Sequence, residues 1–277
     1  MKIAIGNVQM APASTWAERC RLAKEAGFDG VEMWIGSREF NMETSDDEVK
    51  RLADGIRAAG LEVSSIASSL GWKFPLNSPD EGTYREALRI ARRQIECARL
   101  FGTDAILLVT GPADAANYQL DAFNRVIAAF RELAPYAQEQ GVKIGAETCP
   151  SLSKNLMTPQ ECLYFLERVG SDAVGIYLDT ANVLYSGFPH HFMRALGKRV
   201  VRVHFKDRLE ENGKSRATYP GGGGAVDFAS FVRECRQVGY DSWAIMEYGP
   251  APGEAHTFAL MQAAAASTRA ILDGAPV

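Results

Sequence analysis

Eight short apolar stretches, rich in β-branched residues, recur along the chain, and each is followed by a longer segment with apolar residues every three or four positions. The first pattern predicts buried β-strands and the second predicts amphipathic helices. The predicted strands cover residues 2–8, 30–35, 62–68, 105–110, 143–148, 174–180, 200–206 and 243–248. The predicted helices cover residues 15–26, 46–59, 80–101, 116–140, 158–169, 189–196, 227–238 and 255–272.

Polar residues and glycines mark the ends of these helices. Thr15 with Glu18 and Ser45 with Glu48 have the spacing of capping boxes, and Thr158 and Asp227 are predicted N-caps. Glycines follow six of the predicted helices, where a left-handed residue is favoured: Gly27, Gly60, Gly102, Gly141, Gly170 and Gly239.

Eight alternating strand–helix units predict an α/β fold, a (β/α)8 TIM barrel that forms a single domain over residues 1–277. A doubly wound open sheet is the alternative, and it favours a Gly-x-Gly-x-x-Gly turn after the first strand. Residues 7–12 read Asn-Val-Gln-Met-Ala-Pro instead. With 277 residues, of which 47% are hydrophobic, the chain is large enough for one barrel.

Composition narrows the classes of function. The net charge of −4 provides no field that would attract nucleic acid or an anionic membrane, and no run of eighteen apolar residues predicts a membrane span. The five cysteines are an odd number without Cys-x-x-Cys spacing, which is typical of free thiols. We therefore expect a cytoplasmic protein with neither a nucleic-acid nor a membrane partner.

Four consecutive predicted strands end in residues that can bind a metal: Glu147, Asp179, His204 and Glu247. Barrel active sites lie at the carboxyl ends of strands, and neighbouring strands are only about 5 Å apart. Any one of these residues alone could be a helix cap or an ion-pair partner. Together they predict one divalent metal ion; Mn²⁺ suits the ligands best, and Mg²⁺, Co²⁺ or Zn²⁺ are also compatible.

Several motifs resemble a known family. Residues 27–32 read Gly-Phe-Asp-Gly-Val-Glu, residues 178–182 Leu-Asp-Thr-Ala-Asn, residues 204–207 His-Phe-Lys-Asp and residues 246–248 Met-Glu-Tyr. With these motifs the chain resembles the sugar phosphate isomerase/epimerase family of xylose isomerase-like TIM barrels, in the AP endonuclease family 2 superfamily. The resemblance implies a metal held by the four residues above, with Glu147 and Glu247 also acting as the catalytic acid/base pair.

This set of residues suits proton transfer next to a carbonyl. A metal bound to the carbonyl and an adjacent hydroxyl stabilises the developing enediolate, and two glutamates can remove and return the proton. Return of a proton to the other face of the same carbon gives epimerisation, and return to the neighbouring carbon gives isomerisation. Loss of a β-hydroxyl gives dehydration. We expect an isomerase or epimerase of a ketose or related keto-polyol, with or without a phosphate; a metal-dependent dehydratase, similar to inosose dehydratase, is the alternative.

Two other functions fit less well. An endonuclease for abasic DNA, which shares this barrel, needs a cluster of zinc ions bound by many histidines, and this chain has four histidines in all. A non-catalytic ligand-binding barrel would not need the four metal-binding residues. We expect a small sugar or keto-polyol as the partner, and a homo-oligomer, dimeric or tetrameric, because barrels of this type often form one.

The predicted substrate contacts are Glu32, Lys206, Asn182, Trp34, Trp72 and Ser68. Lys206 lies two residues after His204 and so shares its face of the strand; an ion pair with Asp207 or Glu32 is the alternative. Asn182 departs from the family, since many free-ketose 3-epimerases have a histidine there. The tryptophans could stack on a sugar or pack in the core.

Two further features lie in predicted loops. Residues 221–224 are four glycines before a helix, where backbone amides could hold a phosphate, but we favour a simple connection to the Asp227 cap. His190 and His191 open the helix after the sixth strand, and one of them is a weak candidate for a substrate contact.

Overall fold

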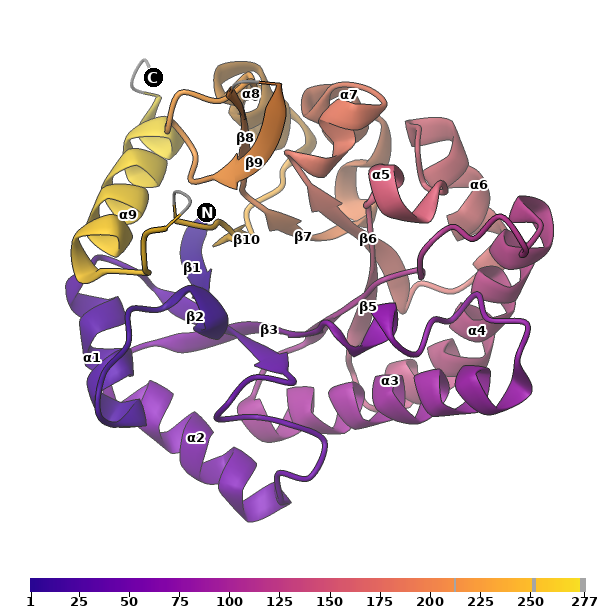
Figure 1. Ribbon diagram of the computed structural model, residues 1–277, viewed down its shortest axis with the longest axis horizontal. Helices are drawn as coiled ribbons and strands as arrows, with labels where there is room; N and C mark the ends of the chain where they lie inside the picture. The colour runs from indigo at the N-terminus through magenta and orange to yellow at the C-terminus, as the bar shows by residue number, and fades with distance from the viewer. Residues whose placement is uncertain (212, 251–252, 275–277) are drawn as a thin grey trace.

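Eight parallel strands close into a barrel, which confirms the predicted TIM-barrel fold (Figure 1). The structure is a computed structural model and describes residues 1–211, 213–250 and 253–274. The barrel strands are β1 Lys2–Gly6, β2 Gly30–Ile35, β3 Glu62–Ser68, β4 Ala105–Leu108, β5 Lys143–Glu147, β6 Val174–Asp179, β7 Val200–His204 and β10 Trp243–Met246. Around the barrel they follow the order β1-β10-β7-β6-β5-β4-β3-β2.

Helices surround the barrel and connect successive strands (Figure 1). The long ones are α1 Trp16–Glu25, α2 Asp46–Ala58, α3 Glu81–Phe101, α4 Gln119–Glu139, α6 Pro159–Val169, α7 Pro189–Leu196, α8 Phe228–Val238 and α9 Phe258–Asp273. Helix α4 begins three residues later than predicted, because Asp114 forms a turn first: its carboxylate accepts from the amide of Ala116 and its carbonyl from that of Asn117. No helix in the described ranges is long and apolar enough to cross a membrane.

The predicted helix ends are largely confirmed. Ser45 and Glu48 form a complete capping box. At the first helix only half of the predicted box forms: the Thr15 hydroxyl accepts from the Glu18 amide, but the Glu18 carboxylate accepts from the amide of Ser14 instead of Thr15. Thr158 and Asp227 cap their helices as predicted. All six predicted C-terminal glycines have positive φ angles.

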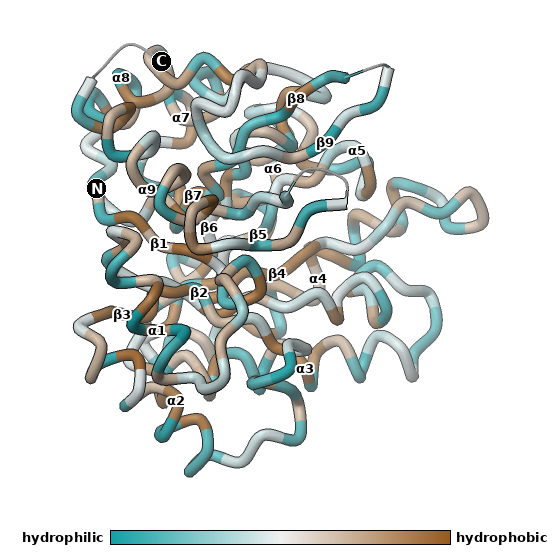
Figure 2. Tube along the Cα trace, turned by 60° about the vertical axis from the view of Figure 1, so that its left-hand side comes forward, coloured by the Kyte–Doolittle hydropathy of each residue, from teal (hydrophilic) through white to brown (hydrophobic). Residues whose placement is uncertain are grey.

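One large hydrophobic cluster combines residues of the barrel strands with residues of the surrounding helices, and the hydrophobic colour of β1 is visible in Figure 2. Fully or almost fully buried aromatic rings anchor it: Phe28, Phe40, Phe130, Phe165, Phe192, Phe205 and Phe231. A second apolar cluster fills the barrel itself and consists of Ala4, Ala67, Leu107, Val109, Tyr177, Trp243 and Ile245. The strands are therefore buried on both faces, which explains their nearly continuous apolar runs. All five cysteines are buried and free.

The structure contains elements at the barrel mouth that the sequence pattern does not predict. An antiparallel hairpin of β8 Asp207–Glu211 and β9 Lys214–Thr218 follows β7, and a short helix, α5 Pro150–Ser153, follows β5 (Figures 1 and 2). The residues of β8 read Asp-Arg-Leu-Glu-Glu and become exposed toward the hairpin turn. Without a buried face, the hairpin lacks the alternating apolar positions by which strands are recognised.

Each glycine of residues 221–224 has a local structural reason. A Cβ on Gly222 would lie 2.7 Å from the Thr218 hydroxyl oxygen, and one on Gly224 would lie 2.2 Å from an oxygen of Asp207. Gly221 and Gly223 have positive φ angles of 78° and 83°. Close packing and backbone conformation thus account for this run without a bound phosphate.

Gly145 makes room for a large ring inside the barrel. It lies on β5 beside Tyr177, and a Cβ at position 145 would come within 2.9 Å of the Tyr177 Cβ and Cδ2 atoms. Tyr177 is completely buried and fills the space beneath the barrel mouth.

We predict that Gly145→Ala lowers the free energy of unfolding by about 1–3 kcal/mol, because the added methyl group overpacks the barrel interior. The shift of the urea or thermal midpoint measures it. Gly249→Ala is the control, since a Cβ there meets no atom within 4 Å. Equal stability of the two variants would show that the Tyr177 ring moves aside freely.

Candidate metal centre

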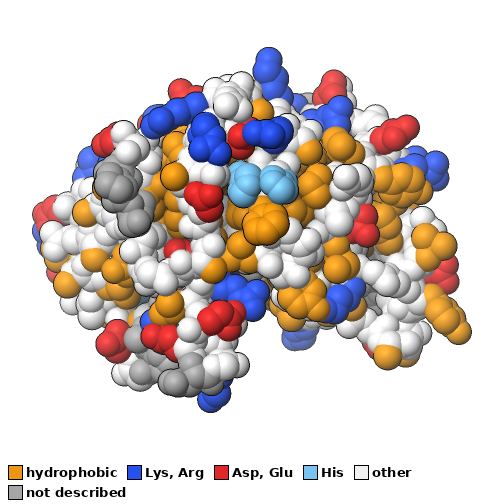
Figure 3. Space-filling model, turned by 90° about the horizontal axis from the view of Figure 1, so that it is seen from above, with side chains coloured by type: hydrophobic (Ala, Val, Ile, Leu, Met, Phe, Trp, Pro, Cys, Tyr) orange, Lys and Arg blue, Asp and Glu red, His pale blue; other side chains and the backbone are white. Residues whose placement is uncertain are grey.

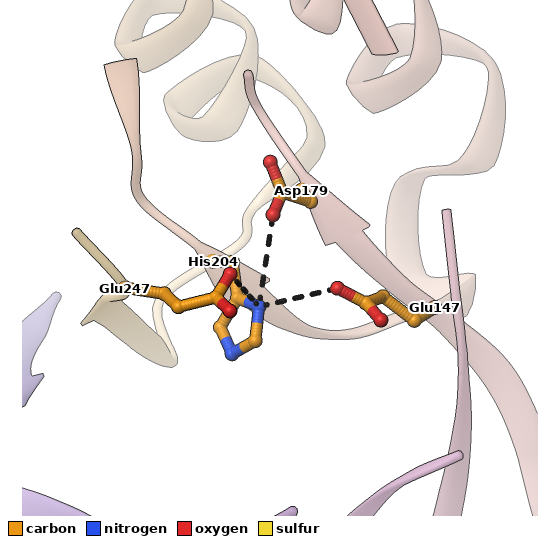
Figure 4. A group of neighbouring side chains, drawn as sticks. All are labelled: Glu147, Asp179, His204 and Glu247. Carbon is orange, nitrogen blue, oxygen red and sulfur yellow. Dashed lines mark ion pairs between the residues drawn. The ribbon is translucent and has the colours of Figure 1, made fainter. Parts of the chain in front are cut away.

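Four side chains converge at the carboxyl end of the barrel (Figure 4). Glu147, Asp179 and His204 are the last residues of β5, β6 and β7, and Glu247 directly follows β10. One ligand atom from each lies within 4.8 Å of the others. The Nδ1 atom of His204 is 3.6 Å from Glu147 Oε1, 3.8 Å from Asp179 Oδ2 and 3.3 Å from Glu247 Oε2.

Glu32 fixes the orientation of the His204 ring. The Nε2 atom of the buried imidazole is 3.0 Å from Glu32 Oε2. An ionised carboxylate only accepts hydrogen bonds, so Nε2 carries the proton that is donated to Glu32. This leaves Nδ1, which is buried and has no hydrogen-bond partner among the described residues, facing the three carboxylates. A carboxylate behind a metal-binding histidine is a common means of holding the ring and its tautomer.

The Glu32 side chain is completely buried, and its predicted contact with a substrate stays a prediction. Its Oε1 atom accepts from the hydroxyls of Ser65, at 2.8 Å, and Tyr177. Its Oε2 atom accepts from Trp34 Nε1, at 2.8 Å, in addition to His204. Both oxygens are thus occupied by protein donors, and Glu32 supports the histidine from behind.

Asp179 is held by the backbone. Its Oδ1 atom accepts from the amides of Ala181 and Asn182, at 2.9 and 2.8 Å, and its own amide donates to the Thr148 hydroxyl. With Oδ1 occupied, Oδ2 is the oxygen directed toward His204 and Lys206.

The site concentrates negative charge in a buried space. Burial raises the pKa of Glu147, and the neighbouring charges of Glu247 and Asp179 raise it further. Burial alone would also raise the pKa of Asp179, but Lys206 and His204 outweigh it and lower that pKa. For His204, burial is outweighed by Glu32 and Glu247, which raise its pKa well above the usual value.

These observations fit a divalent cation. Two side chains, Lys206 and a protonated His204, provide the positive charge beside four buried or half-buried carboxylates. A divalent ion would supply the missing charge and would leave His204 neutral. Three carboxylates and one imidazole are donors suited to Mn²⁺ and similar ions, and the unpartnered Nδ1 atom is positioned as the nitrogen ligand.

Lys206 and Asn182 lie beside the cluster. The Lys206 Nζ atom is 2.7 Å from both Asp179 Oδ2 and Glu247 Oε2, so its partners are metal-site carboxylates and not Asp207 or Glu32. Both residues line a cavity of about 350 Å³ that also contains Arg208 of β8. Their contact with a substrate remains a prediction.

The remaining predicted contacts differ in their surroundings. Trp34 and Trp72 are partly buried against the apolar cluster inside the barrel, and the Trp34 ring stacks on His204 with 6.3 Å between centroids. The buried Ser68 hydroxyl donates to the Ile35 carbonyl and accepts from the Leu70 amide. Both hydrogen bonds are made to the backbone, and a contact between Ser68 and a substrate stays a prediction.

The two neighbouring histidines of α7 lie apart from this cavity. His190 and His191 pack against each other, with 4.5 Å between centroids, and against Phe188. The pair is visible in pale blue beside a hydrophobic side chain in Figure 3. Neither residue lines the cavity next to Lys206.

Two supporting residues, Tyr177 and Ser65, were missed by the sequence analysis. Tyr177 lies two positions before Asp179 and therefore faces the same side of β6, a spacing that could have identified it. Ser65 pairs with Glu32 across β2 and β3, and this register is known only from the structure.

Comparison with known proteins identifies the family. A model of the xylose isomerase-like TIM barrel family matches residues 20–269. The chain belongs to this family. It is 25% identical to the probable L-ribulose-5-phosphate 3-epimerase UlaE of Mycoplasma pneumoniae, over 80% of this chain and 72% of the relative. It is 27% identical to L-ribulose-5-phosphate 3-epimerase UlaE of Shigella flexneri, over 81% and 79% of the two chains.

Solved structures share the fold. A structure of L-ribulose 3-epimerase superimposes with a TM-score of 0.81 and 22% identity, covering 98% of this chain and 94% of that one. The apo form of 3-keto-D-glucoside 4-epimerase, YcjR, from E. coli gives a TM-score of 0.79 and 18% identity, with 98% of each chain covered.

We predict that Glu32→Gln weakens Mn²⁺ binding roughly 10- to 100-fold, because the imidazole loses the charged acceptor that orients it. Calorimetric titration with Mn²⁺ measures this. Trp34→Phe is the matched control. It removes one hydrogen bond to Glu32 but leaves the hydrogen bond between Glu32 and His204, so the Mn²⁺ affinity of this variant should change less. Unchanged affinity in Glu32→Gln would contradict the supporting role of Glu32.

Proposed function

We propose that this protein is a divalent-metal-dependent epimerase of a ketose or a related keto-polyol. The curated relatives named above are 3-epimerases of a ketose phosphate, and the family match covers most of the chain. The proposal assigns the metal to Glu147, Asp179, His204 and Glu247, and the acid/base work to the two glutamates.

One observation carries the proposal: the two glutamates approach the cluster from opposite sides. In the barrel order β10-β7-β6-β5, the strands that lead to Glu247 and Glu147 flank those of His204 and Asp179. Figure 4 shows the two carboxylates on either side of the imidazole. Two carboxylates on opposite sides of a bound substrate can take a proton from one face of a carbon and deliver one to the other, which inverts that carbon.

The surrounding residues then have defined tasks. When bound, the metal polarises the carbonyl and an adjacent hydroxyl, which makes the neighbouring C–H acidic. One glutamate removes this proton and the other, protonated, returns one; the handedness of the substrate decides which does which. Lys206 donates to a substrate oxygen and balances the charge of Asp179 and Glu247. Trp34 and Trp72 form an apolar wall beside the sugar.

Dehydration is the competing outcome. Lys206 lies 2.7 Å from Glu247, and an ammonium group in this position could protonate a departing hydroxyl. The epimerase relatives favour inversion of a carbon centre. The two reactions differ in their products: epimerisation takes up a solvent proton without losing water, whereas dehydration loses water.

We predict that the Mn²⁺-loaded protein exchanges one carbon-bound proton of its ketose with heavy water and forms the epimer without losing water. NMR and mass spectrometry of the products measure this. Treatment with EDTA should stop the exchange and lower the thermal midpoint, because an ion that binds only the folded state stabilises it. Irreversible formation of a dehydrated product would favour the lyase, and full activity after chelation would contradict a metal mechanism.

We predict that Glu247→Gln and Glu147→Gln each lower turnover by at least roughly 10²-fold, the scale of a positioned acid or base. Circular dichroism should show an intact fold. Glu254→Gln, the same change at an exposed glutamate, should retain turnover. Near-normal turnover in either of the first two variants would remove that residue from the proposed pair.

A further inference from the structure

The cavity beside the metal centre is lined by cations and hydrogen-bond donors. Its polar lining consists of Ser151, Asn182, Tyr185, Lys206, Arg208 and Ser215, with Arg216 at the hairpin; among the described residues, no aspartate or glutamate lines it. At about 350 Å³ it is large enough for a small ligand. Lys206 connects it to the metal centre, since its ammonium group contacts Asp179 and Glu247.

Arg208 has unused hydrogen-bonding capacity toward this cavity. Its Nε atom donates to Glu210 at 2.7 Å, while neither Nη atom makes a hydrogen bond within the part of the chain that the structure describes. The antiparallel pairing of Arg208 with Ala217 and of Glu210 with Ser215 places these four residues on one face of the hairpin, where Glu210 pairs with Arg208. Three of them, Arg208, Ser215 and Ala217, line the cavity, as does Arg216.

The opposite rim also presents a donor. The Lys154 ammonium group lies 2.9 Å from the Tyr185 hydroxyl oxygen. When Lys154 donates to that oxygen, the hydroxyl proton of Tyr185 is free to be donated to a ligand. Arginine, serine, tyrosine and lysine side chains around this cavity are suited to an anion with several oxygens.

We propose that this cavity binds the anionic terminus of the substrate, a phosphate or a carboxylate, while the carbonyl end lies at the metal. The inference rests on the proposed function and narrows its substrate to ketoses that carry an anionic group. Arg208 is the main determinant, because a guanidinium can bind such a group through two parallel hydrogen bonds. The glycines at 221–224 are not needed for this, since packing accounts for them.

The test compares wild-type protein, Arg208→Gln and Lys214→Gln, all loaded with Mn²⁺. Lys214 is an exposed residue of the same hairpin outside the cavity, so its change removes the same charge without touching the subsite. The substrates are ketopentose 5-phosphates, the matching free ketopentoses and 2-ketohexonates. Arg208→Gln should lower the preference in kcat/KM for the anionic over the free ketose by roughly 10- to 100-fold, and Lys214→Gln should leave it unchanged. The anionic group, phosphate or carboxylate, for which Arg208→Gln loses this preference is the one that the cavity binds.

A binding measurement separates this proposal from the proposed function. Ribitol 5-phosphate and ribitol have no carbonyl and undergo no turnover, so the ratio of their dissociation constants reports on the phosphate contacts of the subsite. Selective weakening of ribitol 5-phosphate binding in Arg208→Gln supports the subsite even if no ketose is epimerised. An unchanged preference, or equal losses in Arg208→Gln and Lys214→Gln, would overturn it, whereas continued epimerisation of free ketoses would leave the proposed function intact.

Discussion

The buried negative charge at one end of the barrel is the constraint on which this site depends. Glu32, Glu147 and Asp179 are buried there, and Glu247 is only 24% exposed. Carboxylates removed from water are costly unless opposite charges and hydrogen bonds compensate them. The protein provides Lys206, His204 and several backbone and hydroxyl donors, and a divalent ion would complete this compensation.

The barrel interior holds the histidine in place for that ion. Gly145 admits the Tyr177 ring, Tyr177 and Ser65 donate to Glu32, and Glu32 accepts from the His204 Nε2 atom. This chain of contacts crosses β5, β6, β3, β2 and β7, so it exists only once the barrel has closed. A packing change at Gly145 would therefore reach His204, the proposed nitrogen ligand, through two intervening side chains.

The sequence predicted the barrel because the strands are nearly continuous apolar runs and the helices are amphipathic, several of them with a polar N-cap. It also predicted the convergence of Glu147, Asp179, His204 and Glu247, since residues at the ends of consecutive parallel strands meet at one mouth. It did not show that Glu32 and Ser68 form hydrogen bonds within the protein, because a polar residue near a strand end can face the mouth or the protein, and only the register between strands decides this. The β8–β9 hairpin, with Arg208 and Ser215, has little apolar patterning and could not be predicted.

The central claim is that side chains from four strands bind a single ion. Anomalous X-ray diffraction from a crystal of the protein soaked with Mn²⁺ tests it directly. The account predicts one strong peak about 2.0–2.2 Å from the His204 Nδ1 atom and from oxygens of Glu147, Asp179 and Glu247. Absence of a peak there, or a peak that excludes the imidazole, would contradict the account.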